Sequence, residues 1–302
     1  MVVAEGRSKA DRLVRYASIA SVAVAITLIV LKLIAWFVSD AVSVLASMAD
    51  SSLDFVASFI TLVAIKIAQR PADDNHRLGH GKAEALAGFL QSLIIAGSAI
   101  YLIVTGIDRT LDPQALVQTE FALFVMVGSL LLTISLNIFQ FYVVRRSDSL
   151  AIRADAAHYT VDIIATSATI TALSLSNHPE LDGIVATCIG LFVFITALSI
   201  AKRAVEMLMD TELHDEVRQA VIEVAESTPG VLGTHNMRSW QSGSKRIVIL
   251  EIVFEQDTKL SETKTVLDTI QTRLENLSLN IDATLVPTFE LAHHQNIALR
   301  RP

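Results

Sequence analysis

Six stretches of the sequence are each long and apolar enough to cross a lipid bilayer. A bilayer core of about 30 Å requires roughly 20 apolar residues in a helix. The six stretches cover residues 16–38, 41–67, 84–107, 119–144, 154–176 and 182–201. Of all residues 52% are hydrophobic and only 18% are charged, whereas about a quarter are charged in ordinary soluble domains. The sequence therefore predicts an α-helical membrane protein with six transmembrane helices.

Lysine and arginine are distributed unevenly among the connectors of these stretches. The connectors after the first, third and fifth stretches contain one basic residue, Arg109. The N-terminus and the other connectors contain many, among them Arg7, Arg70, Lys82 and Arg145. Because basic segments tend to stay in the cytoplasm, the pattern predicts a multi-pass membrane protein with both termini cytoplasmic. The apolar run after the basic N-terminus is too long for a signal peptide, so we interpret it as a retained first span.

From about residue 210 the sequence changes to the pattern of a small soluble domain. Amphipathic helices are expected at 213–227 and 261–277, and strands at 234–240, 246–255 and 281–288. The order helix–strand–strand–helix–strand predicts an α+β fold. We therefore expect a six-helix transmembrane domain at 1–209 and a cytoplasmic α+β domain at 210–302. The formal net charge of −7 argues against a nucleic-acid partner.

Four ionisable side chains lie inside the predicted spans at matched spacing. Asp50 and Asp54 are four residues apart in the second span, as are His158 and Asp162 in the fifth. Side chains at this spacing share one face of a helix. A charge at this depth costs at least about 2.5–3.5 kcal/mol, and adjacent anions repel each other unless a cation or protons neutralise them. Three carboxylates and one imidazole suit tetrahedral Zn²⁺ and also admit Cd²⁺, Fe²⁺ or Mn²⁺.

Other polar residues of the spans have more than one interpretation. The aspartates of the second span could be hydrogen-bonded to neighbouring helices, although the matched pairs favour a cation site. Asp155 is either a charge at the cytoplasmic entrance or a helix cap. Lys32 is interpreted as a snorkelling or paired cation. Asn137 and Gln140 could orient the ligands or could hydrogen-bond neighbouring helices.

The connector between the second and third spans carries a second group of metal-ligand side chains. Asp73, His76 and His80 lie within eight residues, and Gly79 and Gly81 allow the backbone to fold around an ion. Spacing alone leaves two interpretations open, because exposed loop histidines are often merely solvated.

The sequence as a whole resembles the cation diffusion facilitator family, most closely its bacterial zinc and ferrous-iron efflux branch. The resemblance is carried by SMADSSLD in the second span, PADDNHRLGHGKAE in the loop, ADAAHYTVD in the fifth span and HNMRSWQSG in the soluble domain. It implies a homodimeric antiporter of the cell (inner) membrane that exchanges a divalent metal ion for protons, with a metallochaperone-like cytoplasmic domain. It also implies a transport site at Asp50, Asp54, His158 and Asp162.

The resemblance implies further roles outside the spans. It indicates a second metal site at Asp73, His76 and His80, and an interlock of the two membrane halves through Lys82 and Asp210. The family's efflux branch has a two-zinc site in the soluble domain, of which His235 matches the first position. The later positions contain no histidine here, so we expect this site to be incomplete or absent.

We therefore expect efflux of Zn²⁺, with Cd²⁺, Fe²⁺ and Co²⁺ as alternative ions, by alternating access and proton antiport. A passive divalent-cation channel with the same acidic residues is the alternative. We do not expect an enzyme, because a membrane metalloprotease would normally need a motif such as HExxH, which the sequence lacks. A metal-sensing receptor is disfavoured by the weak ligand set of the soluble domain.

Overall fold

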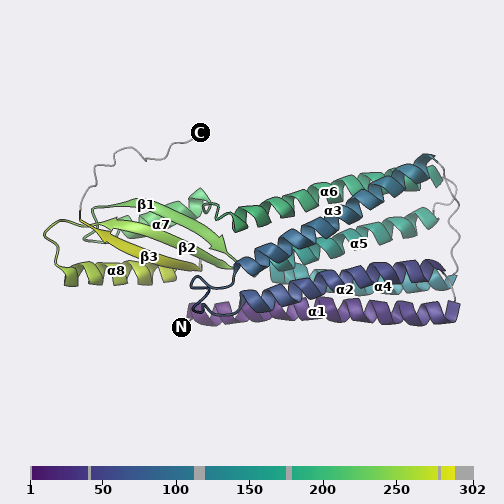
Figure 1. Cartoon of the computed structure of the whole chain (residues 1–302), viewed down its shortest axis with the longest axis horizontal. Helices are drawn as coiled ribbons and strands as arrows, with labels where there is room; N and C mark the ends of the chain where they lie inside the picture. The colour runs from purple at the N-terminus through teal and green to yellow at the C-terminus, as the bar shows by residue number, and fades with distance from the viewer. Residues whose placement is uncertain (1, 40–41, 112–119, 175–178, 278–279, 290–302) are drawn as a thin grey trace. The chain divides into compact units, whose positions relative to one another are not determined.

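The chain forms two compact units: residues 7–208, and a C-terminal unit of residues 209–302 that also includes residues 1–6. The computed structural model describes residues 2–39, 42–111, 120–174, 179–277 and 280–289. Each unit is described here by itself (Figure 1).

Six long helices make up the first unit, as the sequence predicts. They are α1 (Val2–Ser39), α2 (Val42–Ala68), α3 (Lys82–Leu111), α4 (Glu120–Val144), α5 (Leu150–Ser174) and α6 (Pro179–Leu208). Within the described residues, α1, α2, α3, α4 and α6 are long and apolar enough to cross a membrane. The sixth, α5, carries four ionisable side chains, Arg153, Asp155, His158 and Asp162.

The helix α5 is the most enclosed of the six. It packs against α2, α3, α4 and α6, and Figure 1 shows it between the α3–α6 pair and the group of α1, α2 and α4. Its polar side chains can therefore face other helices rather than lipid, which is where ionisable residues are tolerated in membrane proteins. Outward-facing positions of other helices are apolar and open, as at Tyr101 and Phe192.

Glycines bring α3 and α6 into direct backbone contact. A Cβ atom added at Gly106 of α3 would lie 2.8 Å from the carbonyl oxygen of Gly183 in α6. A Cβ atom at Gly190 would lie 3.1 Å from the carbonyl oxygen of Ala99. Close packing of small residues stabilises helix pairs in lipid, where apolar burial gives little net driving force. The two helices thus form one pair within the unit.

The C-terminal unit has the predicted order of elements. It consists of α7 (Asp215–Glu226), β1 (Gly233–Ser242), β2 (Lys245–Val253), α8 (Leu260–Glu275) and β3 (Ile281–Thr288). The sheet order is β1-β2-β3, with β1 antiparallel and β3 parallel to β2. The central strand β2 is the β-branched, apolar segment, as expected for a strand with neighbours on both sides.

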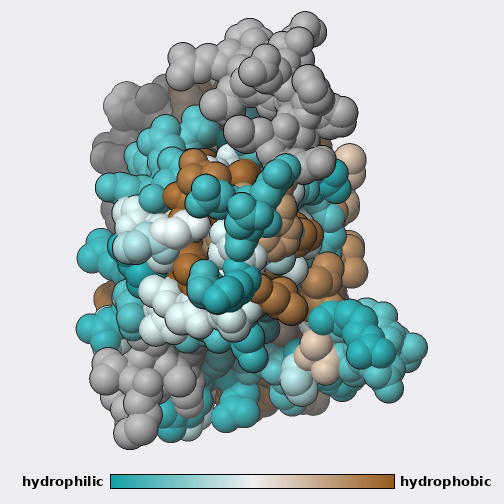
Figure 2. Space-filling model, turned by 90° about the vertical axis from the view of Figure 1, so that its left-hand side faces the viewer, coloured by the Kyte–Doolittle hydropathy of each residue, from teal (hydrophilic) through white to brown (hydrophobic). Residues whose placement is uncertain are grey.

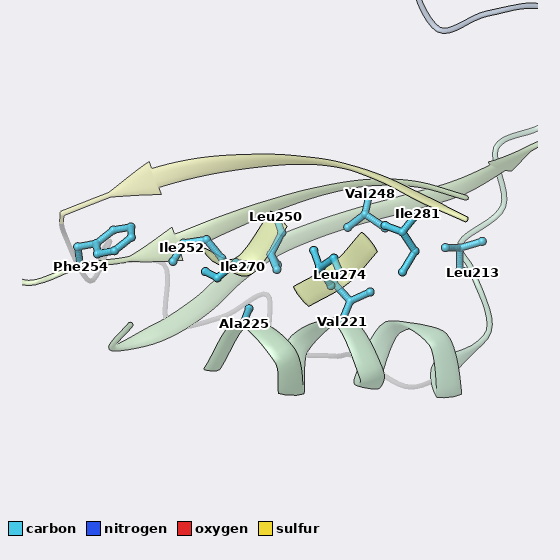
Figure 3. Packing of buried hydrophobic residues seen from close by; sticks show 10 residues of the cluster. All are labelled: Leu213, Val221, Ala225, Val248, Leu250, Ile252, Phe254, Ile270, Leu274 and Ile281. Carbon is cyan, nitrogen blue, oxygen red and sulfur yellow. The ribbon is translucent and has the colours of Figure 1, made fainter. Parts of the chain in front are cut away.

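One apolar core holds this unit together. Figure 3 shows Leu250 and Ile252 of the sheet beside Val221 of α7 and Ile270 and Leu274 of α8. The amphipathic faces predicted for the two helices are therefore the faces that cover the sheet.

The surface visible in Figure 2 is mainly hydrophilic, with hydrophobic groups between the polar ones.

Candidate metal centre

Three of the four predicted transport-site residues meet between α2 and α5. The imidazole Nε2 of His158 lies 2.9 Å from Oδ1 of Asp54 and 3.8 Å from Oδ2 of Asp162. One ligand atom from each residue lies within 4.8 Å of the others. Asp54 and His158 are 104 positions apart in sequence, so the packing of α2 against α5 creates this site. We call Asp54, His158 and Asp162 the buried cluster.

The three side chains of the buried cluster differ in how far they are exposed. The side chain of His158 is 5% exposed, that of Asp54 is 17% exposed and that of Asp162 is 35% exposed. With an ionised Asp54, the contact of 2.9 Å requires a proton on Nε2, which donates to Oδ1. Among the described residues, Nδ1 of His158 has no hydrogen-bond partner. Nε2 is thus the imidazole nitrogen that faces both carboxylates.

The fourth predicted residue, Asp50, belongs to α2 and lies one helical turn before Asp54. Its side chain is outside the described part of the structure, so its role as a ligand stays a prediction. The i, i+4 spacing places it on the same helix face as Asp54.

A cavity of about 60 Å³ adjoins the buried cluster. It is lined from four helices, including Lys32 of α1, Ser51 of α2, Thr133 of α4 and Thr166 of α5. Lys32 donates a hydrogen bond from Nζ to Oγ of Ser51 at 2.7 Å. The interpretation of Lys32 as a paired cation thus holds, and its polar partner lies inside the bundle.

A second set of polar side chains lies next to the buried cluster and is fully enclosed. Asp155 is 0% exposed, and it accepts hydrogen bonds from Nε2 of Gln140 at 2.7 Å and from Oγ of Ser58 at 3.3 Å. The amide of Gln140 also donates to Oγ of Ser21 at 2.9 Å. The hydroxyls of Ser58 and Tyr159 lie 2.9 Å apart. We call Ser21, Ser58, Gln140, Asp155 and Tyr159 the Asp155 cluster.

Asp155 does not cap its helix, although capping was one of the two interpretations of it. The helix α5 begins at Leu150, and a cap has to lie at the first turn. Ser149 fills that position, because its Oγ accepts the backbone N–H of Ile152 at 3.4 Å. Ser149 in turn donates to the buried carboxylate of Glu84 in α3 at 2.6 Å.

The loop between α2 and α3 gathers Asp73, His76 and His80, which we call the loop cluster. Nδ1 of His76 lies 3.2 Å from Oδ1 of Asp73, and Nε2 of His80 lies 3.4 Å from Oδ2 of the same carboxylate. The imidazole ring centres are 4.4 Å apart. Gly79 has a φ of +84°, a conformation that favours glycine and turns the chain between the two histidines. The donor set fits a metal ion.

Backbone N–H groups stabilise the ionised carboxylate of Asp73. Its Oδ1 accepts the N–H groups of His76 at 2.7 Å and of Asn75 at 3.0 Å. These bonds, that from the His76 backbone foremost, lower the pKa of Asp73 below its ordinary value. The carboxylate is thus held ionised, which is the form that binds metal.

The remaining predicted residues are not part of either cluster. Lys82 opens α3 and Asp210 belongs to the C-terminal unit, so their interlock stays a prediction. His235 is exposed on β1, opposite Glu251 of β2. Among the described residues, His235 belongs to neither group of metal-ligand side chains. A metal site there also stays a prediction.

Tyr159 and Ser21, which lie beside the buried cluster, were not identified from the sequence. Tyr159 lines the cavity and is 1% exposed, and Ser21 joins α1 to the Asp155 cluster. Tyr159 follows His158 directly, so its position beside the site was available as a signal. Ser21 has no comparable signal, because isolated serines in spans usually serve helix packing.

Apolar helices that enclose two carboxylates and an imidazole define a multi-pass membrane protein that handles cations. Residues 18–209 match the description "Cation efflux transmembrane domain", and residues 213–285 match "Cation efflux protein, cytoplasmic domain". The chain belongs to the cation efflux family, the cation diffusion facilitators that its motifs resemble.

Three relatives have the same degree of similarity to this chain. They are proteins named "Cation-efflux pump FieF" from Shigella boydii serotype 18, Shigella boydii serotype 4 and Escherichia coli strain SE11. Each is 39% identical over 262 residues, which is 86% of this chain and 87% of the relative's length. The chain is thus a divalent-cation efflux transporter, and the soluble unit is the cytoplasmic domain of that family.

Proposed function

We propose that the protein exports Zn²⁺ from the cytoplasm in exchange for protons, through a site formed by Asp50, Asp54, His158 and Asp162. The observation that carries the proposal is the convergence of His158 on both Asp54 and Asp162 inside the helical bundle. Anions in this position repel each other and are poorly solvated, so a divalent cation stabilises them strongly.

The donor set favours Zn²⁺ among the candidate ions. Oxygen and nitrogen ligands about 2.0 Å from a tetrahedral Zn²⁺ lie about 3.3 Å from one another. The three donor atoms lie within 4.8 Å of one another, so a small inward movement of side chains suffices to surround the ion. Cd²⁺, Fe²⁺ and Co²⁺ are the alternative cargoes, because geometry and ligand type discriminate only partly between these ions.

The contact between His158 and Asp54 supports exchange of the metal ion for protons. When Nε2 carries a proton it donates to Asp54, and when it loses that proton the same lone pair can bind the metal ion. Protons therefore compete with metal for one atom. A site facing a more acidic compartment releases its cargo, and a site facing the cytoplasm loads it.

Several features of the proposal rest on the sequence and on the family. The positive-inside pattern supports cytoplasmic termini in the inner membrane, and the cytoplasmic domain of this family supports a homodimer. The loop cluster is proposed as a second metal site at the cytoplasmic side. The Lys82–Asp210 interlock is proposed to hold the two membrane halves of the dimer together.

Transport into inverted vesicles tests the proposal. With an imposed proton gradient we expect saturable, gradient-dependent Zn²⁺ uptake by the wild-type protein and almost none by Asp54→Ala. Thr196→Ala is the matched control, because the exposed Thr196 hydroxyl of α6 donates to the carbonyl oxygen of Phe192 one turn earlier in the same helix and lines neither cluster among the described residues. Wild-type uptake by Asp54→Ala would contradict the site assignment.

The same assay separates a carrier from a passive channel. A carrier gives slow, saturable flux that stops when the proton gradient is collapsed, whereas a channel gives large ohmic currents that persist. The enclosed Asp155 cluster beside the site and the relatives' name of efflux pump both disfavour an open channel.

A further inference from the structure

The cavity beside the buried cluster reaches from Tyr159 of the Asp155 cluster toward one end of the bundle. Its lining residues Lys32, Ser129 and Thr166 lie toward the ends of α1, α4 and α5 at Ser39, Glu120 and Ser174. Those helix ends are opposite to the loop cluster, which follows the end of α2 at Ala68. We call the end that carries the loop cluster the basic end, because Arg70, Arg77, Arg145 and Arg146 are there.

The Asp155 cluster lies on the other side of the buried cluster, toward the basic end. Asp155 precedes His158 by three residues in α5, and Ser58 follows Asp54 by four residues in α2. At a rise of about 1.5 Å per residue, both positions are about one turn closer to the basic end. Gln140 is likewise seven residues beyond the cavity residue Thr133 in α4.

The Asp155 cluster joins the same four helices that line the cavity. Ser21 comes from α1, Ser58 from α2, Gln140 from α4 and Asp155 from α5. All four side chains are 0% exposed, whereas Asp162 on the cavity side is 35% exposed. The bundle is therefore open to the cavity on one side of the site and sealed by hydrogen-bonded polar groups on the other.

Hydrogen bonds between polar side chains, rather than apolar contacts, hold the helices together on this closed side of the site. The carboxylate of Asp155 holds α2 through Ser58 and α4 through Gln140, while Gln140 also holds α1 through Ser21. Among the described residues, Oε1 of Gln140 has no hydrogen-bond partner although it is buried. A buried acceptor without a partner favours rearrangement, because opening would let water or a cation reach it.

We propose that the Asp155 cluster is the gate between the transport site and the basic end, with Asp155 as its gating residue. When the four helices separate at this level, Ser58 and Gln140 leave the carboxylate. The exposed carboxylate then attracts the incoming divalent cation one helical turn before the transport site. This role rests on the proposed function, since it assigns the basic end to the side from which cargo is loaded.

Side-specific thiol labelling tests the gate. Thr166→Cys in a Cys188→Ala background places one thiol on the cavity side of the site, and a membrane-impermeant reagent is applied to inverted and to right-side-out vesicles. In the otherwise unchanged protein we expect slow labelling from the basic-end side. Asp155→Ala should raise that rate about tenfold, the population shift expected from losing charge-assisted hydrogen bonds.

The conservative variant distinguishes gating from general loosening. In Asp155→Asn, the new amide can donate to Oε1 of Gln140 after that side chain rotates, and its oxygen can still accept from Ser58. We therefore expect Asp155→Asn to restore slow labelling while its KM for Zn²⁺ rises, because the attracting charge is gone. If Asp155→Ala does not accumulate in the membrane, Gln140→Leu and Ser58→Ala replace it, each with a smaller increase.

Asn137→Ala is the matched control. Asn137 also joins α4 to α5, by donating to the carbonyl oxygen of Ala156 at 2.8 Å, but it is not part of the Asp155 cluster. Unchanged basic-end labelling in the cluster variants, or an equal increase in Asn137→Ala, would overturn the gate. If the wild-type protein does not transport Zn²⁺, the proposed function is contradicted instead. The labelling rates do not depend on transport, so they test the gate separately.

Discussion

The buried cluster and the loop cluster use the same ligand types in opposite surroundings. In the buried cluster, His158 is 5% exposed and lies between carboxylates from two helices. In the loop cluster, Asp73 is 52% exposed and His76 is 57% exposed. Both groups are compact, with ligand atoms within 4.8 Å of each other.

The difference lies in what stabilises the anions when no cation is bound. Two backbone N–H groups stabilise Asp73, whose side chain is also half exposed to solvent, so the loop turn can form with or without an ion. Asp54 and Asp162 lie inside the helical bundle and are 17% and 35% exposed, so desolvation and mutual repulsion are larger there than in an exposed loop. Replacing a ligand in the buried cluster should therefore stop transport, whereas the loop cluster should only modulate it.

The largest expected effect is the loss of transport in Asp162→Ala. Removal of a ligand from an enclosed site should lower Zn²⁺ uptake at least about 100-fold, beyond the 10–100-fold typical of residues that merely orient ligands. The measurement is initial uptake rate in inverted vesicles at equal protein density. An uptake rate within a factor of two of wild type would contradict the prediction that transport requires the buried cluster more than the loop cluster.

A change of selectivity should follow from His158→Asp. Replacing imidazole with carboxylate leaves an all-oxygen site, which suits harder ions such as Mn²⁺. We expect the ratio of Mn²⁺ to Zn²⁺ uptake to rise about tenfold. Competition between the two ions in the same vesicles measures this ratio, and an unchanged metal profile would count against His158 as a ligand.

A smaller effect is expected from Asp73→Ala. Loss of the carboxylate that both loop histidines contact should weaken Zn²⁺ binding at the loop about tenfold and slow transport only several-fold. Asp74→Ala is the matched control, because this neighbouring aspartate is 93% exposed and pairs with Arg77 rather than with a histidine. Calorimetric titration of the full-length proteins measures the binding, and equal losses in both variants would argue against the loop site.

The smallest effect concerns pH. Hydrogen bonding lowers the folded-state pKa of Asp73 below its unfolded value, so this group stabilises the loop turn above the unfolded pKa. That contribution is lost only as pH falls through the lower folded pKa. We expect no change in Asp73 ionisation between about pH 7 and pH 5. A carboxyl carbon NMR titration, assigned with Asp73→Asn, checks this, and a titration step within that range would contradict it.

Local patterns in the sequence were sufficient for much of the fold. The apolar stretches predict the six long helices, and the alternation of helix and strand signals predicts the C-terminal fold. These predictions succeed because each pattern reflects one element and its immediate solvent, lipid or water. The helix bounds were less certain, since α1 continues back to Val2 through a charged segment that apolarity alone does not mark.

In both clusters, contacts between residues close in sequence could be predicted, whereas contacts between different helices could not. Asp73, His76 and His80 lie in one turn, so their proximity follows from spacing and from a glycine with positive φ. The pairing of His158 with Asp162 also follows from helical spacing. Asp155 was ambiguous in sequence, because an entrance charge and a buried network residue look the same until the neighbouring helices are placed.

By itself, the sequence determined that the chain has several apolar spans, that Asp and His side chains recur at helical spacing within two of them and that a loop with Asp73, His76 and His80 follows the second span. Only the tertiary structure brought Asp54 against His158 and closed the Asp155 cluster around Gln140. The physical reason is that spacing constrains side chains on one helix. Contacts between helices depend on how their small and apolar faces pack, which no local pattern encodes.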